Sequence, residues 1–107
     1  MAINFFKSVQ ADLLTSSEII YTAPLGFTAI VLMAQVSNIT SNPYEVSMSV
    51  SVNSIETSLV TDFEVPANDA AGVLTGKLVL EAGQSVIASA SNNSSLQLVM
   101  SILESQN

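Results

Sequence analysis

Residues 44–52 read Tyr-Glu-Val-Ser-Met-Ser-Val-Ser-Val, and this stretch decides the fold class. Apolar residues occupy every second position: Tyr44, Val46, Met48, Val50 and Val52. Glu45 and three serines fill the positions between them. Because successive side chains of a β-strand point to opposite faces, this alternation predicts a strand with one buried face and one face in water.

Further strands are predicted on both sides of this stretch. The two-residue period returns near the C-terminus, where one face carries Leu96, Leu98, Met100 and Ile102. Residues 73–80 and 85–91 are predicted as a hairpin through Glu81–Gln84, in which Gly83 can supply a positive φ. Residues 19–23 and 27–37 are predicted as a second hairpin, joined by a type I turn at Pro24-Leu-Gly26.

The remaining segments are less regular. Residues 27–36 are apolar on both faces, with Ala29, Val31 and Met33 alternating with other aliphatics, which predicts a strand that is central, buried from both sides or buried by a partner. Residues 57–65 form a weaker strand candidate ending at Pro66, and residues 38–43 and 66–72 are predicted loops. Residues 3–14 fit either a strand or a short amphipathic helix.

These segments together predict an all-β fold, an antiparallel β-sandwich of the jelly-roll or Ig-like type. About eight strands follow one another at spacings of roughly 8 to 12 residues, as in sandwiches and small barrels. A length of 107 residues is the common size of one domain. We therefore expect one domain over residues 1–107, in which residues 1–17 form an N-terminal arm or an edge strand.

Composition narrows the function classes. A hydrophobic fraction of 49% with 10% charged residues predicts a folded chain. The net charge of −7, set against only Lys7 and Lys77, would repel phosphate backbones, so no nucleic-acid partner is expected. No secretion signal is recognised at the N-terminus. The longest apolar run, residues 29–34, is too short to span a bilayer, so no membrane partner is expected.

The sequence offers little for catalysis. The absence of His and Cys removes the usual general base, the thiol nucleophile and the commonest metal ligands. Three carboxylates near the Pro66 turn, Asp62, Glu64 and Asp69, could flank a glycosidic bond or hold calcium. We interpret them as a solvated acidic loop, and we assign no catalytic residue, no cofactor and no metal site.

Several aliphatic residues fall off the predicted core face. We expect these to form a protein interface: Ile30, Val79, Ile87, Val99 and Leu103. Since a small sandwich has one core between its sheets, aliphatics on both faces of several strands indicate a second buried surface, covered by an oligomer or by a large partner. The alternative is that isolated exposed aliphatics are normal on any protein surface.

Several motifs resemble those of small virion modules from tailed bacteriophages, the phages of cyanobacteria in particular. They are Tyr21-Thr-Ala-Pro-Leu-Gly-Phe-Thr-Ala-Ile-Val31, Val36-Ser-Asn38, Leu78-Val-Leu-Glu-Ala-Gly-Gln-Ser-Val86, Ser89-Ala-Ser91 and Ser101-Ile-Leu-Glu104. In that group a Tyr-Thr-x-Pro-x-Gly turn opens the sandwich, a Leu-x-x-Gly-x-x-Ile hairpin closes it, and a Ser-x-x-Glu strand ends the domain. The resemblance covers residues 19–104.

The resemblance implies a non-enzymatic structural protein of the virion. Either a head decoration (cement) protein clamped over the major capsid protein or a module of the tail fibre or baseplate fits it. We favour the cement protein, because the chain carries no coiled coil or collagen-like shaft. It would be made in the host cytoplasm, lie on the capsid surface and associate as a dimer or trimer. A carbohydrate-binding module and a carboxylate glycosidase remain as alternatives from other classes.

Overall fold

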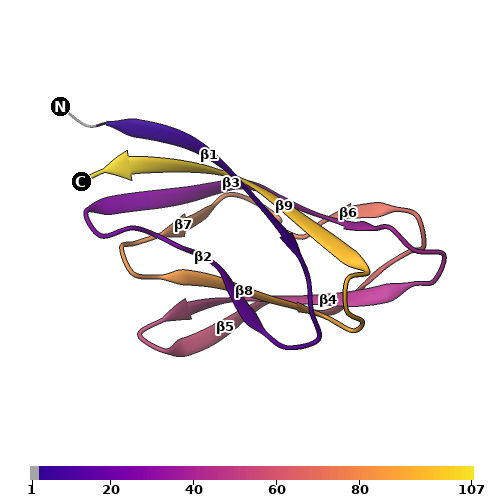
Figure 1. The fold of residues 1–107 in the computed structure, drawn as a ribbon. Coiled ribbons are helices and arrows are strands. Elements are labelled where there is room, and N and C mark those ends of the chain that lie inside the picture. Colours follow the sequence, from indigo (N-terminus) through magenta and orange to yellow (C-terminus); the bar gives the residue numbers. More distant parts are fainter. Residues whose placement is uncertain (1–2) are drawn as a thin grey trace.

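The structure is a computed structural model that describes residues 3–107. Nine strands and no helix occur within that range. The strands are β1 (Asn4–Asp12), β2 (Glu18–Thr22), β3 (Phe27–Asn38), β4 (Tyr44–Val52), β5 (Ile55–Val65), β6 (Ala70–Gly72), β7 (Leu78–Leu80), β8 (Ser85–Ala90) and β9 (Leu96–Gln106). Figure 1 shows them as two layers, with both ends of the chain on the same side of the molecule.

The two layers are antiparallel sheets with a defined strand order. Sheet A has the order β1-β9-β3-β6, and β7 pairs with β3 on the same side as β6, so that these two short strands share one edge. Sheet B has the order β2-β8-β4-β5. Every connection except β4–β5 and β6–β7 crosses from one sheet to the other, which is the arrangement of the eight-position jelly roll. The predicted β-sandwich is confirmed, and the strand order selects the jelly roll over the Ig-like arrangement.

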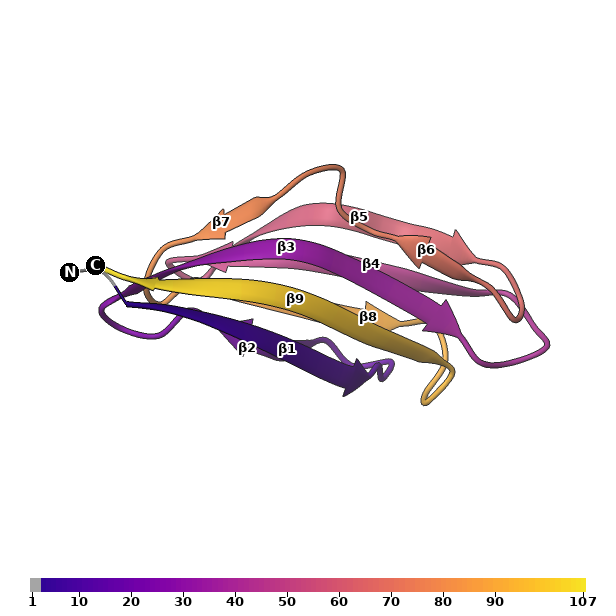
Figure 2. The ribbon, with the colours of Figure 1, turned by 90° about the horizontal axis from the view of Figure 1, so that it is seen from above.

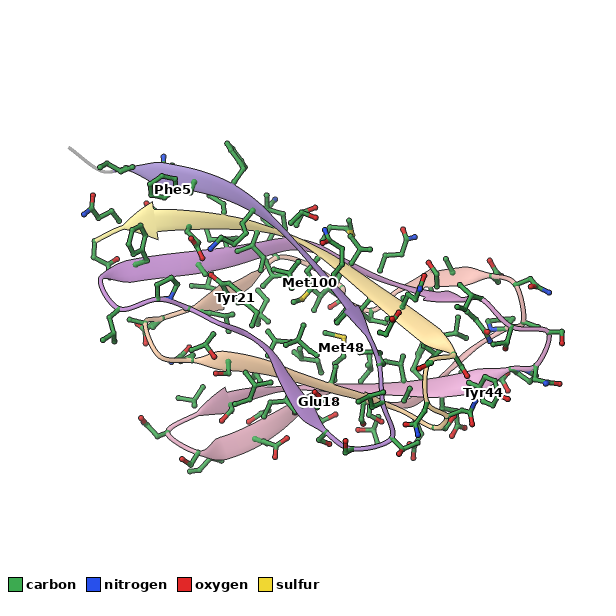
Figure 3. The ribbon with its side chains drawn as sticks, in the orientation of Figure 1. Phe5, Glu18, Tyr21, Tyr44, Met48 and Met100 are labelled. Carbon is green, nitrogen blue, oxygen red and sulfur yellow. The ribbon has the colours of Figure 1, made fainter. Side chains whose placement is uncertain are left out.

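The core lies between the two sheets and follows the predicted alternation. Leu96, Leu98, Met100 and Ile102 of β9 are at most 1% exposed, and Val46 and Met48 of β4 face them from sheet B. Figure 3 shows Met100 and Met48 pointing toward one another between the layers. Each such side chain stabilises the fold by about 1.5–3 kcal/mol when fully buried.

Both predicted hairpins are wrong, because each pair of segments is divided between the two sheets. β2 lies in sheet B and β3 in sheet A, and β7 and β8 are divided in the same way. A turn sequence specifies that the chain reverses, whereas the partner of each strand is decided by which sheet can bury its apolar face. The hairpin that does form joins β4 to β5, through a type I′ turn in which Asn53 and Ser54 have φ values of 53° and 67°.

Two turns carry the chain between the sheets. Phe27 N–H donates to Pro24 C=O over 3.2 Å, and Gly26 has a φ of 82° at the third turn position, so the turn is of type II instead of the predicted type I. Gly83, with a φ of 86°, has the predicted left-handed conformation in the turn closed by Gln84 N–H and Glu81 C=O.

Three other segments either differ from the prediction or settle a choice that the sequence left open. The predicted loop 66–72 contains β6 at its end, and the predicted strand 73–80 is regular only over Leu78–Leu80. The N-terminal segment is strand β1, paired antiparallel with β9 at the rim of sheet A (Figure 2). Residues 1–2 of the expected arm lie outside the described residues. β3 is central, between β9 and the β6/β7 edge, as predicted.

Candidate interaction surface

A row of apolar side chains crosses the outer face of sheet A. The strand register places Phe6 of β1 opposite Leu103 of β9, Leu103 opposite Ile30 of β3, and Ile30 opposite Val79 of β7. Directly opposed residues share a face and lie about 4.5–5.5 Å apart, so these four side chains form a continuous line, called here the apolar row. Its two ends are open, because Phe6 is 81% exposed and Val79 is 57% exposed.

A β-bulge widens the apolar row on β3. The register with β9 shifts between Val31 and Met33, so that Ala29 and Val31 face the core before the bulge and Ala34 and Val36 after it. Leu32 is half-buried and Met33 is 40% exposed. The prediction that Met33 shares a face with Ala29 and Val31 is therefore wrong, because the inserted residue reverses the alternation.

Charge is distributed unequally between the two outer faces. Among the strand residues of sheet A that face outward, Asp12 at the end of β1 is the one carboxylate. The strands of sheet B carry four carboxylates on their outer face, Glu45, Glu56, Asp62 and Glu64, while Glu18 of β2 falls opposite the buried Ala88. Glu45 and Glu64 are directly opposed, so that repulsion between the two carboxylates lowers the stability of the fold. Both carboxylates favour contact with water over contact with a partner. Desolvating the apolar row against a partner therefore requires little removal of charge from water.

The five predicted interface residues do not lie on one surface. Ile30, Val79 and Leu103 belong to the apolar row. Val99 is half-buried on the same outer face, between Gln10 and Gln35, and is separated from the row by the Ser8–Ser101 pair. Ile87 lies in sheet B, opposite Ile19 of β2 and Ser49 of β4, and is half-buried there.

Sequence reasoning missed three contributors to this surface: Phe6, Leu32 and Met33. Phe6 was missed because a segment that fits both a strand and a helix has no assignable outer face. A Phe-Phe pair at residues 5–6 is nevertheless a usable signal, since in a strand one of the two must point away from the core.

The motifs of the resemblance meet at a buried contact inside the sandwich. Tyr21 donates its hydroxyl to Glu104 Oε2 over 2.5 Å, and Lys7 Nζ lies 3.2 Å from the same oxygen. Glu104 is 4% exposed, so its charge is held by these two partners. Burial, together with the adjacent carboxylate, raises the pKa of Tyr21 well above its ordinary value. Thr22 Oγ1 bonds Ser85 Oγ over 2.8 Å, which joins the Tyr21 turn to the second motif.

Two of the three carboxylates considered for chemistry accept local hydrogen bonds, Asp62 from Ser47 Oγ and Asp69 from Ala70 N–H. Asp62, with a φ of 49°, donates its backbone N–H to Ser47 Oγ over 3.0 Å. Asp69 accepts from Ala70 N–H over 2.8 Å through its own side chain. Glu64 lies opposite Glu45. Within residues 3–107, no group of three acidic, His or Cys side chains is placed to hold a metal ion. No helix in that part of the chain is long and apolar enough to cross a membrane.

Fold and surface together define a jelly-roll protein with one outer face that carries an apolar row among uncharged polar residues, and one acidic outer face. No protein-family model and no curated protein matches the sequence, so the comparison rests on solved structures. A chain of the Bacillus endospore appendages, a family of disulfide-linked pili, is similar with a TM-score of 0.55 and 11% identity, over 99% of this chain and 88% of that one.

Two viral structures share the fold as well. A chain from the acid-stable capsid of Helicobacter pylori bacteriophage KHP30 is similar with a TM-score of 0.53 and 12% identity, over 97% of this chain and 90% of that one. A chain of the T13 IBDV viral particle is similar with a TM-score of 0.56 and 7% identity, over 95% of this chain and 30% of that one. At these identities the likeness establishes the fold.

Proposed function

We propose that the chain is a non-enzymatic structural protein of a virion, a head decoration (cement) protein that lies on major capsid subunits through its apolar row. The observation that carries this proposal is the pairing of an in-register apolar row with an outer face whose strands hold a single carboxylate, Asp12. Such a face is covered by protein more readily than the acidic face of sheet B. The fold shared with the KHP30 capsid chain supports the assignment.

The jelly-roll framework suits this task physically. The three motifs that meet around Tyr21 and Glu104 tie sheet A to sheet B from within, so the two outer faces are held in a fixed relation. A rigid domain loses little conformational entropy when it binds, and many copies on a symmetric shell would add their binding free energies. Copies that bridge neighbouring capsid subunits would strengthen the shell where internal pressure separates them.

Capsids that lack the protein provide the test. Purified wild-type protein added to them is expected to restore resistance to heat, chelator and low salt, with hundreds of copies per particle by mass spectrometry. Val79→Lys, at the open end of the apolar row, should fail to bind. Ile19→Lys is the matched control, because Ile19 is 65% exposed on a sheet B strand. Equal resistance with and without the protein would exclude the cement role.

A tail fibre or baseplate module is the second candidate, and copy number separates it from the first. A tail component would be present in a few copies per particle and would leave the stability of the head unchanged. The similarity to the chain of the Bacillus endospore appendages does not extend to disulfide linkage, because this chain has no Cys.

The carbohydrate-binding alternative is less well supported by the positions of the aromatic side chains. Tyr21 is buried and engaged with Glu104, and Tyr44 is half-buried. The exposed rings belong to Phe5, Phe6 and Phe63, on strands of two different sheets. Phe5 does neighbour Phe27, with ring centroids 6.0 Å apart, but the rings are tilted by 47° and form no flat platform, so a glycan array should give no signal.

A further inference from the structure

The four sheet edges of this jelly roll are not equally protected against pairing with another strand. β2 is five residues long and bulged, and β5 carries two register shifts together with Glu56, Asp62 and Glu64. The β6/β7 edge consists of two segments of three residues each. β1, in contrast, runs for nine residues with an unbroken register. Shortness, bulges and charge are the usual devices that protect an edge, and β1 lacks the first two.

The two charged residues of β1 both have partners within the chain. Lys7 is engaged with the buried Glu104, and Asp12 accepts a hydrogen bond from Gln97 on the neighbouring strand. Figure 2 shows β1 at the rim of its sheet, with β9 on one side only. In the part of the chain that the structure describes, β9 is the one strand that pairs with β1.

The ladder with β9 shows which backbone groups of β1 are free. Gln106 N–H donates to Ile3 C=O over 2.8 Å, and Leu13 N–H donates to Leu96 C=O over 3.0 Å. Since alternate residues of an antiparallel strand face the same neighbour, the odd-numbered residues between them bond to β9. The even-numbered residues turn their N–H and C=O groups outward: Asn4, Phe6, Ser8, Gln10 and Asp12.

We propose that β1 is a self-association strand, through which two copies pair antiparallel about a two-fold axis at Ser8 and join their A sheets into one. This register uses the outward groups of all five even-numbered residues and forms about ten backbone hydrogen bonds. A two-fold axis centred at Phe6 or Gln10 would leave part of the edge unpaired. Because the same edge is used by both copies, assembly closes at the dimer.

Side chains support a second copy as the occupant. On the outer face, Asn4 falls opposite Asp12 of the second copy, and Phe6 falls opposite Gln10. On the inner face, Phe5 meets the small Ala11 of the second copy, and Lys7 meets Val9. No like charges are opposed, although each chain carries a net charge of −7. Pairing through the acidic edge at β5 would instead place carboxylates against carboxylates.

The joined sheet would present two apolar rows on one side of the dimer. This arrangement does not depend on the proposed function, because edge pairing uses the backbone of β1 whereas capsid binding uses side chains of the outer face. The two proposals can therefore fail separately. Val79→Lys should abolish capsid binding and leave the dimer intact, since Val79 lies at the far edge of sheet A from β1.

Sedimentation equilibrium from about 1 µM to about 1 mM provides the first measurement, because a dimer depends on protein concentration. The wild-type chain should double its mass across this range, and Ser8→Pro should remain monomeric. Proline fits this position because the N–H of Ser8 faces away from β9, so the β1–β9 ladder and the fold measured by circular dichroism are kept. A wild-type chain that stays monomeric, or a Ser8→Pro variant that still dimerises, overturns the proposal.

Cysteine cross-linking tests the register in the otherwise Cys-free chain. Ser8→Cys places the two thiols at the axis, with Cα atoms about 5.5 Å apart, which a disulfide can bridge. Ser101→Cys is the matched control, because Ser101 is the β9 partner of Ser8 and would lie about 14 Å from its mate across three strand spacings. Oxidation should cross-link Ser8→Cys at least about tenfold faster. Equal rates for the two variants contradict β1 pairing.

Discussion

Removing the Glu104 carboxylate tests how the two sheets are held together. Glu104 is 4% exposed and accepts from the Tyr21 hydroxyl over 2.5 Å, with Lys7 Nζ at 3.2 Å. In Glu104→Ala the Tyr21 hydroxyl is left in the interior without its acceptor, which costs about 1–3 kcal/mol. Loss of the one buried methylene, Cγ, adds about 0.8 kcal/mol, while Lys7, which is 48% exposed, regains water at little cost.

The total expected loss of unfolding free energy in Glu104→Ala is about 2–3 kcal/mol, because release of the carboxylate from its buried site offsets part of the sum. Tyr21→Phe alone should cost about 1.5–3 kcal/mol, since it removes a hydrogen bond to a charged group. The double variant has neither an orphaned hydroxyl nor an orphaned carboxylate. Its loss should therefore be smaller than the sum of the single losses by about 1–2 kcal/mol.

Urea unfolding followed by far-ultraviolet circular dichroism measures these free energies, with the slope m expected to be unchanged. A loss of about 2–3 kcal/mol corresponds to a fall in Tm of about 8 °C or more in a chain of this size. Losses that add within about 0.3 kcal/mol would refute the reasoning, because the two groups would then not share one interaction. Loss of two-state behaviour in Glu104→Ala alone would instead show that the contact is needed for the native packing.

Three further substitutions or conditions have definite expected outcomes. Because the pKa of Tyr21 is raised in the folded chain, the folded chain keeps a proton that the unfolded chain releases near pH 10. The free energy of unfolding should therefore fall as the pH rises above 10. Tyr21→Phe should show a smaller fall, measured by the same urea unfolding. Met100→Ala, at 0% exposure, should cost about 2–5 kcal/mol in thermal unfolding. Gly83→Ala, at a φ of 86°, should cost about 1 kcal/mol, whereas Gly76→Ala, with open space and no positive φ, should be close to neutral.

Strand positions were predictable because burial in a sandwich imposes a two-residue period on the chain itself. The bounds of β4 coincide with the alternating stretch 44–52, and β9 contains the predicted residues 96–103. The period fails at Leu32–Met33, where a bulge inserts one residue into β3. Nothing in a fully apolar run marks that insertion, because either phase of the alternation buries aliphatic side chains equally well.

The candidate surface was predictable in part for the same reason. Ile30, Val79 and Leu103 were identified as apolar residues off the core face, and the register aligns them in one row. Val99 and Ile87 satisfied the same sequence criterion, yet one lies apart from the row and the other lies in sheet B. An alternation pattern states that a side chain leaves the core, and it does not state which neighbours that side chain meets.

The amino-acid sequence by itself determined that this protein is an all-β sandwich without the usual catalytic side chains, since periodicity and composition are properties of the chain alone. The tertiary structure decided the strand order, the bulge, the apolar row and the contact of Tyr21 with Glu104, residues that lie 83 positions apart. Those features depend on which apolar faces can be buried together. Burial is a property of the assembled sheets, and no local segment encodes it.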